Sequence, residues 1–338
     1  MVPDIIVSRK GGAGMKKAIL LLLVILVLPL PAAEGETESV TLRINGKSLT
    51  VPADSEYVDL GRLSVPNAED NYRVLADFIS SLPNLKKLDM FSTDIRRKQA
   101  DALAEQFPDI EFGWTIVIPC TNSLHPERTP HRVRTDATAF STLHNNSCTH
   151  HTSEILSVLR YCKNLQALDI GHNDATNLDF LYDLPHLKVL ILACNTSGDS
   201  KLTDITPVGS LKELQYLEMF KNDFRDISCL AGCENLVDLN ICFNRITDLS
   251  PLYGLKNLRR LWVYNCNTHN YDDVPTVPAD EVRRLKENLP DCYIDTVSWS
   301  TDGGWREHPR YDTIVQMFWE SEYVPRTVAE YFPFTTLD

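Results

Sequence analysis

The stretch Arg245–Asn265, RITDLSPLYGLKNLRRLWVYN, places an apolar residue at every second or third position. This spacing fits neither the 3.6-residue period of an amphipathic helix nor the strict alternation of a half-buried strand. Close copies of the stretch occur elsewhere in the chain. The informative period is therefore that of a repeat and not that of a single helix or strand.

Each repeat unit has a leading leucine, followed by apolar residues three and five positions later and by Asn or Cys at the eighth position. The leading leucines are residues 165, 187, 214, 236 and 258, so the steps are 22, 27, 22 and 22 residues. The long step contains five extra residues within TSGDSK, residues 196–201, which we interpret as a surface-loop insertion. The sets are Leu165/Leu168/Ile170/Asn173, Leu187/Leu190/Leu192/Asn195, Leu214/Leu217/Met219/Asn222, Leu236/Leu239/Ile241/Asn244 and Leu258/Leu261/Val263/Cys266.

The repeat has a direct physical interpretation. Apolar residues two positions apart lie on one face of a short strand, and the asparagine that follows can satisfy backbone groups left unpaired where the chain turns. The returning segment adds apolar residues six and three positions before each leading leucine, such as Leu252 and Leu255. One coil cannot bury this apolar edge alone, whereas coils stacked about 4.7–4.9 Å apart form a continuous core. The sequence therefore predicts a solenoid.

The segments that follow each turn include ITDLSPL at Ile246, FRDISCL at Phe224 and LTDITPV at Leu202. The unit L-x-x-L-x-L-x-x-[N/C] is the leucine-rich-repeat signature. With Asp-x-Ser-Pro-Leu it resembles the repeats of internalin-type bacterial surface and secreted proteins over Leu165–Cys266. The resemblance implies an α/β solenoid, with a curved parallel sheet on the concave face and short helices or 3-10 turns on the convex face. It also implies recognition of proteins without catalysis; no LPxTG-like sorting motif lies near Asp338.

The N-terminus is typical of a targeting segment. Lys16 and Lys17 precede an eleven-residue apolar run, Ala18–Leu28, and small residues follow up to Ala33. A run of this length fits the roughly 7–15 residues of a signal-peptide core and is short of the roughly 20 that span a membrane. We predict a signal peptide over residues 1–33, with Met15 as an alternative start and an uncleaved anchor as the alternative interpretation. Secretion or a cell-envelope location is expected, with no membrane span after removal.

The rest of the chain divides by the regularity of the repeat. We expect an N-terminal strand and helix cap with a first irregular coil, longer irregular coils with an inserted hairpin, regular 22-residue repeats, and a C-terminal cap that covers the exposed end of the stack. Tryptophans such as Trp305 are expected to pack on that end. The predicted ranges are 34–84, 85–164, 165–273 and 274–338.

Charge and motifs exclude several function classes. The formal net charge of −13 disfavours nucleic acid as a partner. We find no H-E-x-x-H, P-loop or nucleophile-elbow context, and so predict neither an enzyme nor a cofactor. The histidines and cysteine of HNNSCTHH match no closed zinc-site spacing, so no metal is expected. Of nine cysteines, only Cys120 and Cys148 form a plausible disulfide pair. The residues of HNNSCTHH considered as ligands are His144, Cys148, His150 and His151.

Residues two, four and six positions after each leading leucine should point away from the leucine core, onto the concave face. In the later coils they include aromatic residues, arginine and carboxylates, which binding hot spots favour. The alternative is that the C-terminal cap folds over and buries some of these rings. The predicted binding residues are Tyr216, Glu218, Phe220, Asp238, Asn240, Arg260, Trp262 and Tyr264.

The sequence thus favours an exported, monomeric, non-enzymatic recognition or adhesion module that binds a protein or glycoprotein through its concave face. One alternative is a structural envelope scaffold that self-associates. Another is an enzyme that uses the insertion at residues 120–151.

Overall fold

The computed structural model describes residues 38–63, 65, 69–120, 129–144, 148–195, 201–266 and 277–321. The chain divides into two compact units, Met1–Thr115 and Ile116–Asp338. The predicted signal peptide lies outside the described residues. Among the residues that are described, no helix combines the length and apolar character needed to cross a membrane.

The first unit begins with an antiparallel hairpin of β1 (Ser39–Ile44) and β2 (Lys47–Pro52). Asn45 and Gly46 connect the two strands with φ angles of 50° and 73°. Two successive residues with positive φ form the tight turn that matches the twist of a hairpin, and Asn-Gly adopts it most readily. The inner side chains of β1 are buried.

Longer coils follow in the first unit. The strands β3 (Tyr57–Asp59), β4 (Lys87–Met90) and β5 (Glu111–Ile118) pair in parallel, and helices α1 (Glu69–Ser80) and α2 (Arg97–Gln106) connect them. Leu88 lies opposite Val58 and Phe112 in the register. These coils thus return through full helices and not through the short turns of the regular repeats.

The second unit is built on a seven-stranded parallel sheet with one strand per coil, in the order β13-β12-β11-β10-β9-β8-β7. Leu217 lies opposite Leu190 on one side and Leu239 on the other, so the register advances by one repeat without a slip. This confirms the predicted solenoid. The strands are β7 (Ala139–Ser141), β8 (Ala167–Asp169), β9 (Val189–Ile191), β10 (Tyr216–Glu218), β11 (Asp238–Asn240), β12 (Arg260–Trp262) and β13 (Tyr293–Asp295).

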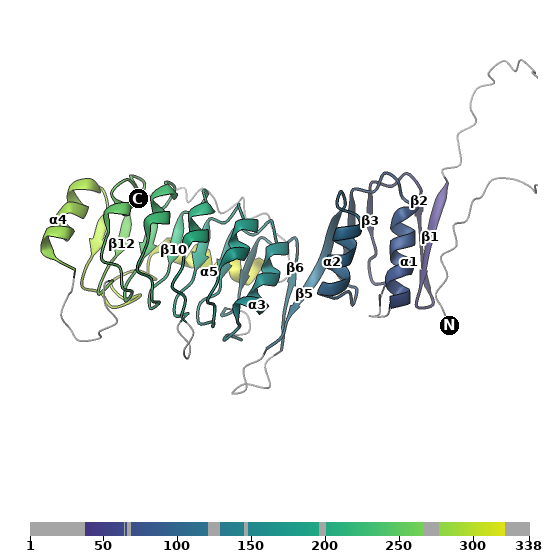
Figure 1. Ribbon diagram of the computed structural model, residues 1–338, viewed down its shortest axis with the longest axis horizontal. Coiled ribbons are helices and arrows are strands. Elements are labelled where there is room, and N and C mark those ends of the chain that lie inside the picture. Colours follow the sequence, from purple (N-terminus) through teal and green to yellow (C-terminus); the bar gives the residue numbers. More distant parts are fainter. Residues whose placement is uncertain are drawn as a thin grey trace, which may run out of the picture. The chain divides into compact units, whose positions relative to one another are not determined.

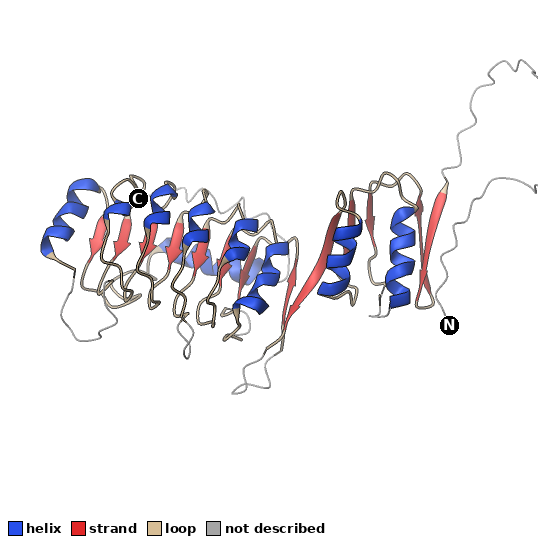
Figure 2. Ribbon diagram, viewed as in Figure 1, coloured by secondary structure: helices blue, strands red, loops and turns tan. Residues whose placement is uncertain are grey.

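Short helices lie on one side of this sheet and a longer helix on the other, as Figure 2 shows. The convex side carries α3 (Ser153–Leu156) and five 3-10 helices, while α4 (Ala279–Asn288) precedes the last strand. On the opposite side, α5 (Pro309–Ser321) lies behind the strands in Figure 1. Strand β6 (His131–Arg134) comes before the seven-stranded sheet in the chain. The 3-10 helices are Ser157–Tyr161, Asp179–Asp183, Thr206–Ser210, Ser228–Gly232 and Ser250–Leu252.

The repeat positions form the leucine core. All members of the five sets predicted from the sequence expose 1% or less of their surface, including the asparagines. Asn222 illustrates the role of the asparagine: its Nδ2 donates to the carbonyl oxygens of Leu192 at 3.1 Å and Met219 at 3.0 Å. Its Oδ1 accepts from the backbone N–H of Asn195 at 2.8 Å. One buried amide thus satisfies backbone groups of two adjacent coils.

The turn into each coil requires a left-handed residue. The residue immediately before each asparagine, or before Cys266, has a φ between 47° and 60°. Residues with side chains rarely adopt this conformation. The same conformation recurs before each of these five residues. We infer that the hydrogen bonds of the buried asparagines, called here the asparagine ladder, hold the turn. The residues are His172, Cys194, Lys221, Phe243 and Asn265.

The asparagine ladder gives a matched test within one solenoid. Asn222→Ala leaves three buried backbone groups without their partner, so we expect a loss of about 2 kcal/mol or more in the free energy of unfolding. Asn235 is exposed and donates one hydrogen bond to the Lys212 carbonyl, so Asn235→Ala should cost less than about 1 kcal/mol. Chemical denaturation followed by circular dichroism measures both. Equal losses would contradict the role assigned to the ladder.

Candidate functional site

The residues predicted to bind a ligand lie together on or just after β10, β11 and β12, but they are buried. The most exposed, Arg260, exposes 7% of its surface. The prediction that these side chains face solvent is therefore wrong. They do point away from the leucine core, but another part of the chain covers them. The residues to which this correction applies are Tyr216, Glu218, Phe220, Asp238, Asn240, Arg260, Trp262 and Tyr264.

The covering layer is residues 296–321, called here the C-terminal segment. It leaves β13 at Asp295, whose Oδ1 accepts from the backbone N–H groups of Val297 and Ser298 at 2.9 and 2.6 Å. Gly303 and Gly304 follow with φ angles of 69° and 88°. A Cβ on Gly303 would lie 2.0 Å from Ser298 Oγ, so this turn requires glycine. The turn leads directly into Trp305.

Side chains of the concave face hold the backbone of the C-terminal segment. Asn240 Nδ2 donates to the Ser300 carbonyl at 2.7 Å, and Trp262 Nε1 donates to the Asp302 carbonyl at 3.0 Å. Arg260 Nη1 donates to the Trp305 carbonyl at 3.1 Å. An extended chain has carbonyls that secondary structure leaves unpaired, and the concave face supplies donors for them.

Trp305 is the central aromatic contact. Its ring centroid lies 5.3 Å from that of Tyr216 and 5.1 Å from that of Trp262. The guanidinium carbon of Arg260 lies 4.8 Å from the Trp305 ring centroid, within the range of a cation–π contact. Trp305 itself exposes 0% of its surface. The concave face therefore encloses this indole on several sides.

Two carboxylates of the concave face bind cations of the C-terminal segment. Glu218 accepts from Trp305 Nε1 at 2.7 Å and from Tyr216 Oη at 2.8 Å, and it forms a salt bridge with Arg306. Asp238 accepts two hydrogen bonds from Arg310, at 2.8 and 2.9 Å. Such bidentate arginine–carboxylate pairs are strong and directional.

Asp238 also pairs with Arg260 of its own sheet, at 2.9 and 3.0 Å. Burial alone would raise the pKa of Asp238, but the hydrogen bonds from Arg260 and Arg310 outweigh it, so the pKa is lowered. Burial works against the charge of Arg306, yet Glu218 raises the pKa of this guanidinium further above its usual value. Burial and the Glu218 charge raise the pKa of the Tyr216 hydroxyl. Asp238 and Arg306 are therefore both charged at neutral pH.

Helix α5 continues the cover over the earlier coils, where it contacts β7 and β8. The concave residues there are small, such as Ala139, Ala167 and Ala193, and they belong to one buried cluster with Met317 and Phe318 of α5. Small side chains leave room for a helix, whereas the larger side chains of β10–β12 meet the narrower extended part of the segment. The size of the concave side chains therefore changes along the sheet and matches the part of the segment that covers them.

One group resembles a catalytic triad in composition only. Ser141 Oγ lies 3.1 Å from His144 Nδ1 and 2.7 Å from Asp169 Oδ2, and the same Nδ1 lies 3.1 Å from Asp169 Oδ2. A triad histidine bridges serine and aspartate through two different nitrogens. Here one nitrogen faces both partners, and Ser141 is buried. This arrangement cannot pass a proton from the serine across the ring.

The histidine-rich segment is split by the structure. His144 pairs with Asp169, and His150 pairs with Asp174 at 3.3 Å. Cys148 is joined to Cys120 by a disulfide with a Cα–Cα distance of 5.8 Å, which confirms that pairing. Cys148 and His151 instead lie next to His131, which sequence reasoning did not select as a ligand. Burial, with the neighbouring His131 charge, lowers the pKa of His151 to about 4, so this ring is neutral at pH 7.

Part of the repeated region matches a known protein family. Residues 234–275 match a family model described as leucine-rich repeats in two copies. The repeated coils are leucine-rich repeats. The matched residues include β11 and β12 with their asparagine and cysteine turns, and the same coil continues across the parallel sheet.

Solved structures with similar coils share little sequence with this chain. Internalin C2 from Listeria monocytogenes is 19% identical, with a TM-score of 0.32, covering 66% of this chain and 82% of that one. The ectodomain of the Arabidopsis receptor kinase HAESA in complex with an N-terminally extended IDA peptide hormone is 17% identical, with a TM-score of 0.32, covering 56% of this chain and 31% of that one. A second HAESA complex, with the hormone and a co-receptor, is 19% identical, with a TM-score of 0.31, covering 70% and 29%.

Trp305 and Trp319 give a matched pair for testing the cover. Trp305→Ala removes a fully buried indole, so we expect a loss of about 3–5 kcal/mol in the free energy of unfolding of the second unit. Trp319 is 53% exposed on α5, so Trp319→Ala should change it by no more than about 0.5 kcal/mol. Guanidinium denaturation followed by near-UV circular dichroism measures both. A tolerated Trp305→Ala would mean that the segment does not cover the face in solution.

The Asp238 pairs predict a pH dependence. Because the folded-state pKa of Asp238 lies below its usual 3.8, the stability from this carboxylate is present above about pH 4 and is lost as pH falls further. Asp238→Asn removes this contribution at every pH. The difference in free energy of unfolding between wild type and variant should therefore be full at pH 7 and shrink below about pH 4. A difference that does not change with pH would show that the charge of Asp238 is unimportant.

Proposed function

We propose that this protein is an exported, non-enzymatic recognition module that binds a protein partner through its concave face, and that the C-terminal segment occupies this face until a partner replaces it. Leucine-rich-repeat solenoids are typically protein-binding modules because they offer an extended concave surface. The observation that carries the proposal is the binding of Trp305 and Arg306 by Tyr216 and Glu218. The concave face thus already holds a segment of its own chain through side-chain contacts.

The contacts define the chemistry of a competing ligand. The Glu218 site accepts an indole N–H and a guanidinium from adjacent residues, and the Asp238 site accepts a second guanidinium four residues later. Asn240 and Trp262 bind backbone carbonyls and so add affinity without demanding particular side chains. We therefore propose a partner that presents tryptophan followed by arginine, with a further arginine one helical turn on.

Attachment to the same chain favours the C-terminal segment over a free peptide, because a tethered ligand has a high effective concentration. A partner must therefore bind more tightly than an untethered copy of the segment, or contact additional surface. Tyr293 in β13 and Val297 at the start of the segment expose 58% and 69% of their surface and could provide a first contact. This arrangement would restrict binding to the correct partner.

The disulfide supports the proposed export. Disulfides persist in oxidising compartments and are rare in the reducing cytosol. Cys120–Cys148 joins the end of β5 to the loop before α3. The internalin-like repeats and the signal peptide predicted over residues 1–33 support the same extracellular or cell-envelope location.

Self-association is the second candidate function. The contacts that hold the C-terminal segment could equally form between two copies, if each inserted its segment into the concave face of the other. Such exchange would produce the envelope scaffold considered from the sequence. It would conserve every contact of Trp305, Arg306 and Arg310 but change the molecular mass of the particle.

A labelled peptide of residues 298–321 tests the proposal. We expect it to bind a released variant of the full chain, Trp305→Ala with Arg306→Ala, at least about 10-fold more tightly than the wild type, because release frees the face. Adding Glu218→Gln to the released variant should abolish the gain. The matched control replaces an exposed tryptophan and an exposed arginine, Trp319→Ala with Arg283→Ala, and should behave as wild type. Fluorescence anisotropy measures binding, and light scattering reports exchange as a dimer.

The contradicting result is a released variant that keeps its circular dichroism spectrum but does not bind the peptide. The C-terminal segment would then be a permanent part of the core, and the concave face would not be a recognition site.

A further inference from the structure

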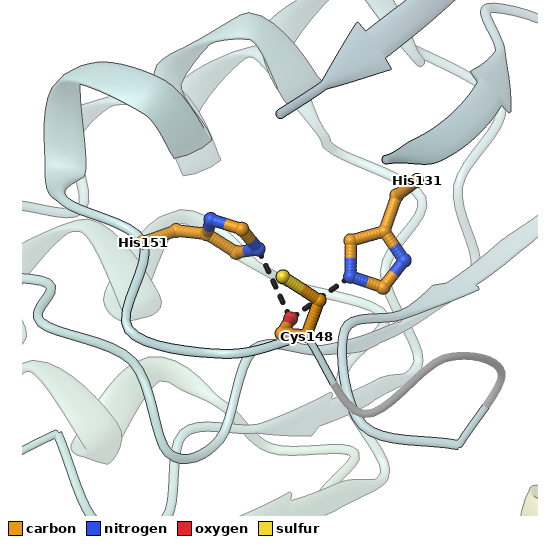
Figure 3. Close-up of side chains that lie close together, drawn as sticks. All are labelled: His131, Cys148 and His151. Atoms are coloured by element: carbon orange, nitrogen blue, oxygen red, sulfur yellow. Dashed lines mark hydrogen bonds between the residues drawn. The ribbon is translucent and has the colours of Figure 1, made fainter. Parts of the chain in front are cut away.

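A second cluster of chemically active side chains lies in the second unit, away from the charged network of the concave face. His131 is on β6, Cys148 is in the loop before α3, and His151 lies two residues before that helix. One ligand atom from each residue lies within 4.8 Å of the others. Figure 3 shows the two imidazole rings on either side of Cys148, with its sulfur between them. All three residues are buried.

Cys120 adds a fourth potential ligand. Its sulfur is bonded to that of Cys148, so it lies one bond length from a member of the cluster. Two sulfurs and two imidazole nitrogens are a donor set that zinc prefers for closed structural sites. Cys148 and His151 are separated by two residues, the local spacing common for paired zinc ligands, while Cys120 and His131 come from other segments. Sequence reasoning missed the set because it considered only HNNSCTHH.

The hydrogen bonds of the cluster are incomplete. Nε2 of His131 and Nε2 of His151 both face the Cys148 carbonyl oxygen, at 2.9 and 3.0 Å. Among the described residues, Nδ1 of His151 has no hydrogen-bond partner although the ring is fully buried. Buried polar atoms nearly always have a hydrogen-bond partner, so a buried nitrogen without one needs an explanation, such as an ion that binds there. Both imidazole rings thus lie beside the two sulfurs, and binding a metal through Nε2 would replace the hydrogen bond of that nitrogen to the Cys148 carbonyl oxygen.

We propose that reduction of the Cys120–Cys148 disulfide converts this cluster into a zinc site formed by Cys120, His131, Cys148 and His151. The end of β5 and the loop before α3 are then joined by a disulfide under oxidising conditions and by Zn²⁺ under reducing conditions. The connection between the end of β5 and the loop before α3 is kept in both states.

Opening the disulfide requires a two-electron reductant, for example a dithiol. Its thiolate attacks Cys120 Sγ, which is the accessible sulfur because Cys120 is partly exposed and Cys148 is buried. Cys148 leaves as a thiolate, and the second thiol of the reductant breaks the mixed disulfide and releases Cys120. The reductant loses two electrons and becomes a disulfide, while its two protons pass to the cysteine sulfurs. Zn²⁺ then binds both sulfurs as thiolates and displaces these two protons.

The geometry requires only small movements. With Zn–S near 2.3 Å and Zn–N near 2.0–2.1 Å, a tetrahedral site places its sulfurs about 3.8 Å apart and each nitrogen about 3.5 Å from each sulfur. Opening the disulfide therefore moves the sulfurs apart by about 2 Å, and the ring nitrogens must approach by about 1 Å from separations of up to 4.8 Å. Rotation about side-chain bonds can supply shifts of this size.

Cobalt(II) binding to the purified full chain tests the site. A phosphine reductant opens the disulfide, and Co²⁺ is then titrated. We expect one Co²⁺ per reduced chain, with visible d–d bands of a tetrahedral site and thiolate-to-cobalt charge transfer, and none with the disulfide intact. Zn²⁺ should displace Co²⁺ and raise the melting temperature of the reduced chain but not of the oxidised chain.

Adjacent histidines supply the matched control. His151→Ala should weaken Co²⁺ binding by more than about 100-fold, whereas His150→Ala, which removes an exposed neighbour paired with Asp174, should leave it unchanged. X-ray absorption of the zinc-loaded wild type should give two sulfur and two nitrogen ligands, a readout that needs no variant. A reduced, folded chain with no tetrahedral cobalt spectrum would overturn the proposal, as would a spectrum from the other cysteines that survives His151→Ala.

Discussion

Each coil of the second unit carries an apolar edge that only the next coil can cover, and the rest of the structure depends on this constraint. The strands stack in parallel without a register slip, so the leucines of successive coils meet in one column. The buried asparagines bind the carbonyls of their own coil and the preceding one. Because apolar burial and hydrogen bonding repeat with the same period, changing one coil affects its neighbours.

The opposite, concave face of the sheet also carries apolar side chains, and in this chain that face is covered as well. The short helices of the convex side cover one face of the sheet, and the C-terminal segment covers the other. The side chains of the concave face differ in size along the sheet, in keeping with this cover. Those under α5 are small, and those around Trp305 are large. The same face carries buried carboxylates, which are stable only because Arg260, Arg306 and Arg310 pair with them. Recognition and folding thus use the same contacts.

The leucine core could be predicted from the sequence because its cause is local and periodic. Residues such as Leu217 and Asn222 repeat at fixed offsets, and short-range geometry then determines which way they point. The exposure of the concave face could not be predicted, because it depends on partners such as Arg310, which lies 72 residues from Asp238. One signal was available: Val189 and Ile191 make the run through Leu192 apolar on both faces, as in strands buried on both sides.

The same reasoning applies to the cysteines and histidines. The Cys120–Cys148 pair could be predicted because both residues fall in loops around the inserted hairpin, whereas cysteines such as Cys162 and Cys233 occupy core positions of the repeat. The position of His131 beside them could not, because it depends on how β6 meets the loop before α3, and no periodic pattern specifies that. Residues held by the repeat were therefore predictable, and residues brought together by insertions were not.

Hydroxyl-radical footprinting of the full chain in solution tests the central claim, that the C-terminal segment covers the concave face. Trp262 exposes 2% of its surface and Trp319 exposes 53%, so the two tryptophans serve as an internal comparison. Trp319 should be oxidised quickly, whereas Trp262 and Tyr216 should be protected. Rapid oxidation of Trp262 and Tyr216 in the folded chain would show that the concave face is open, and the account would be wrong.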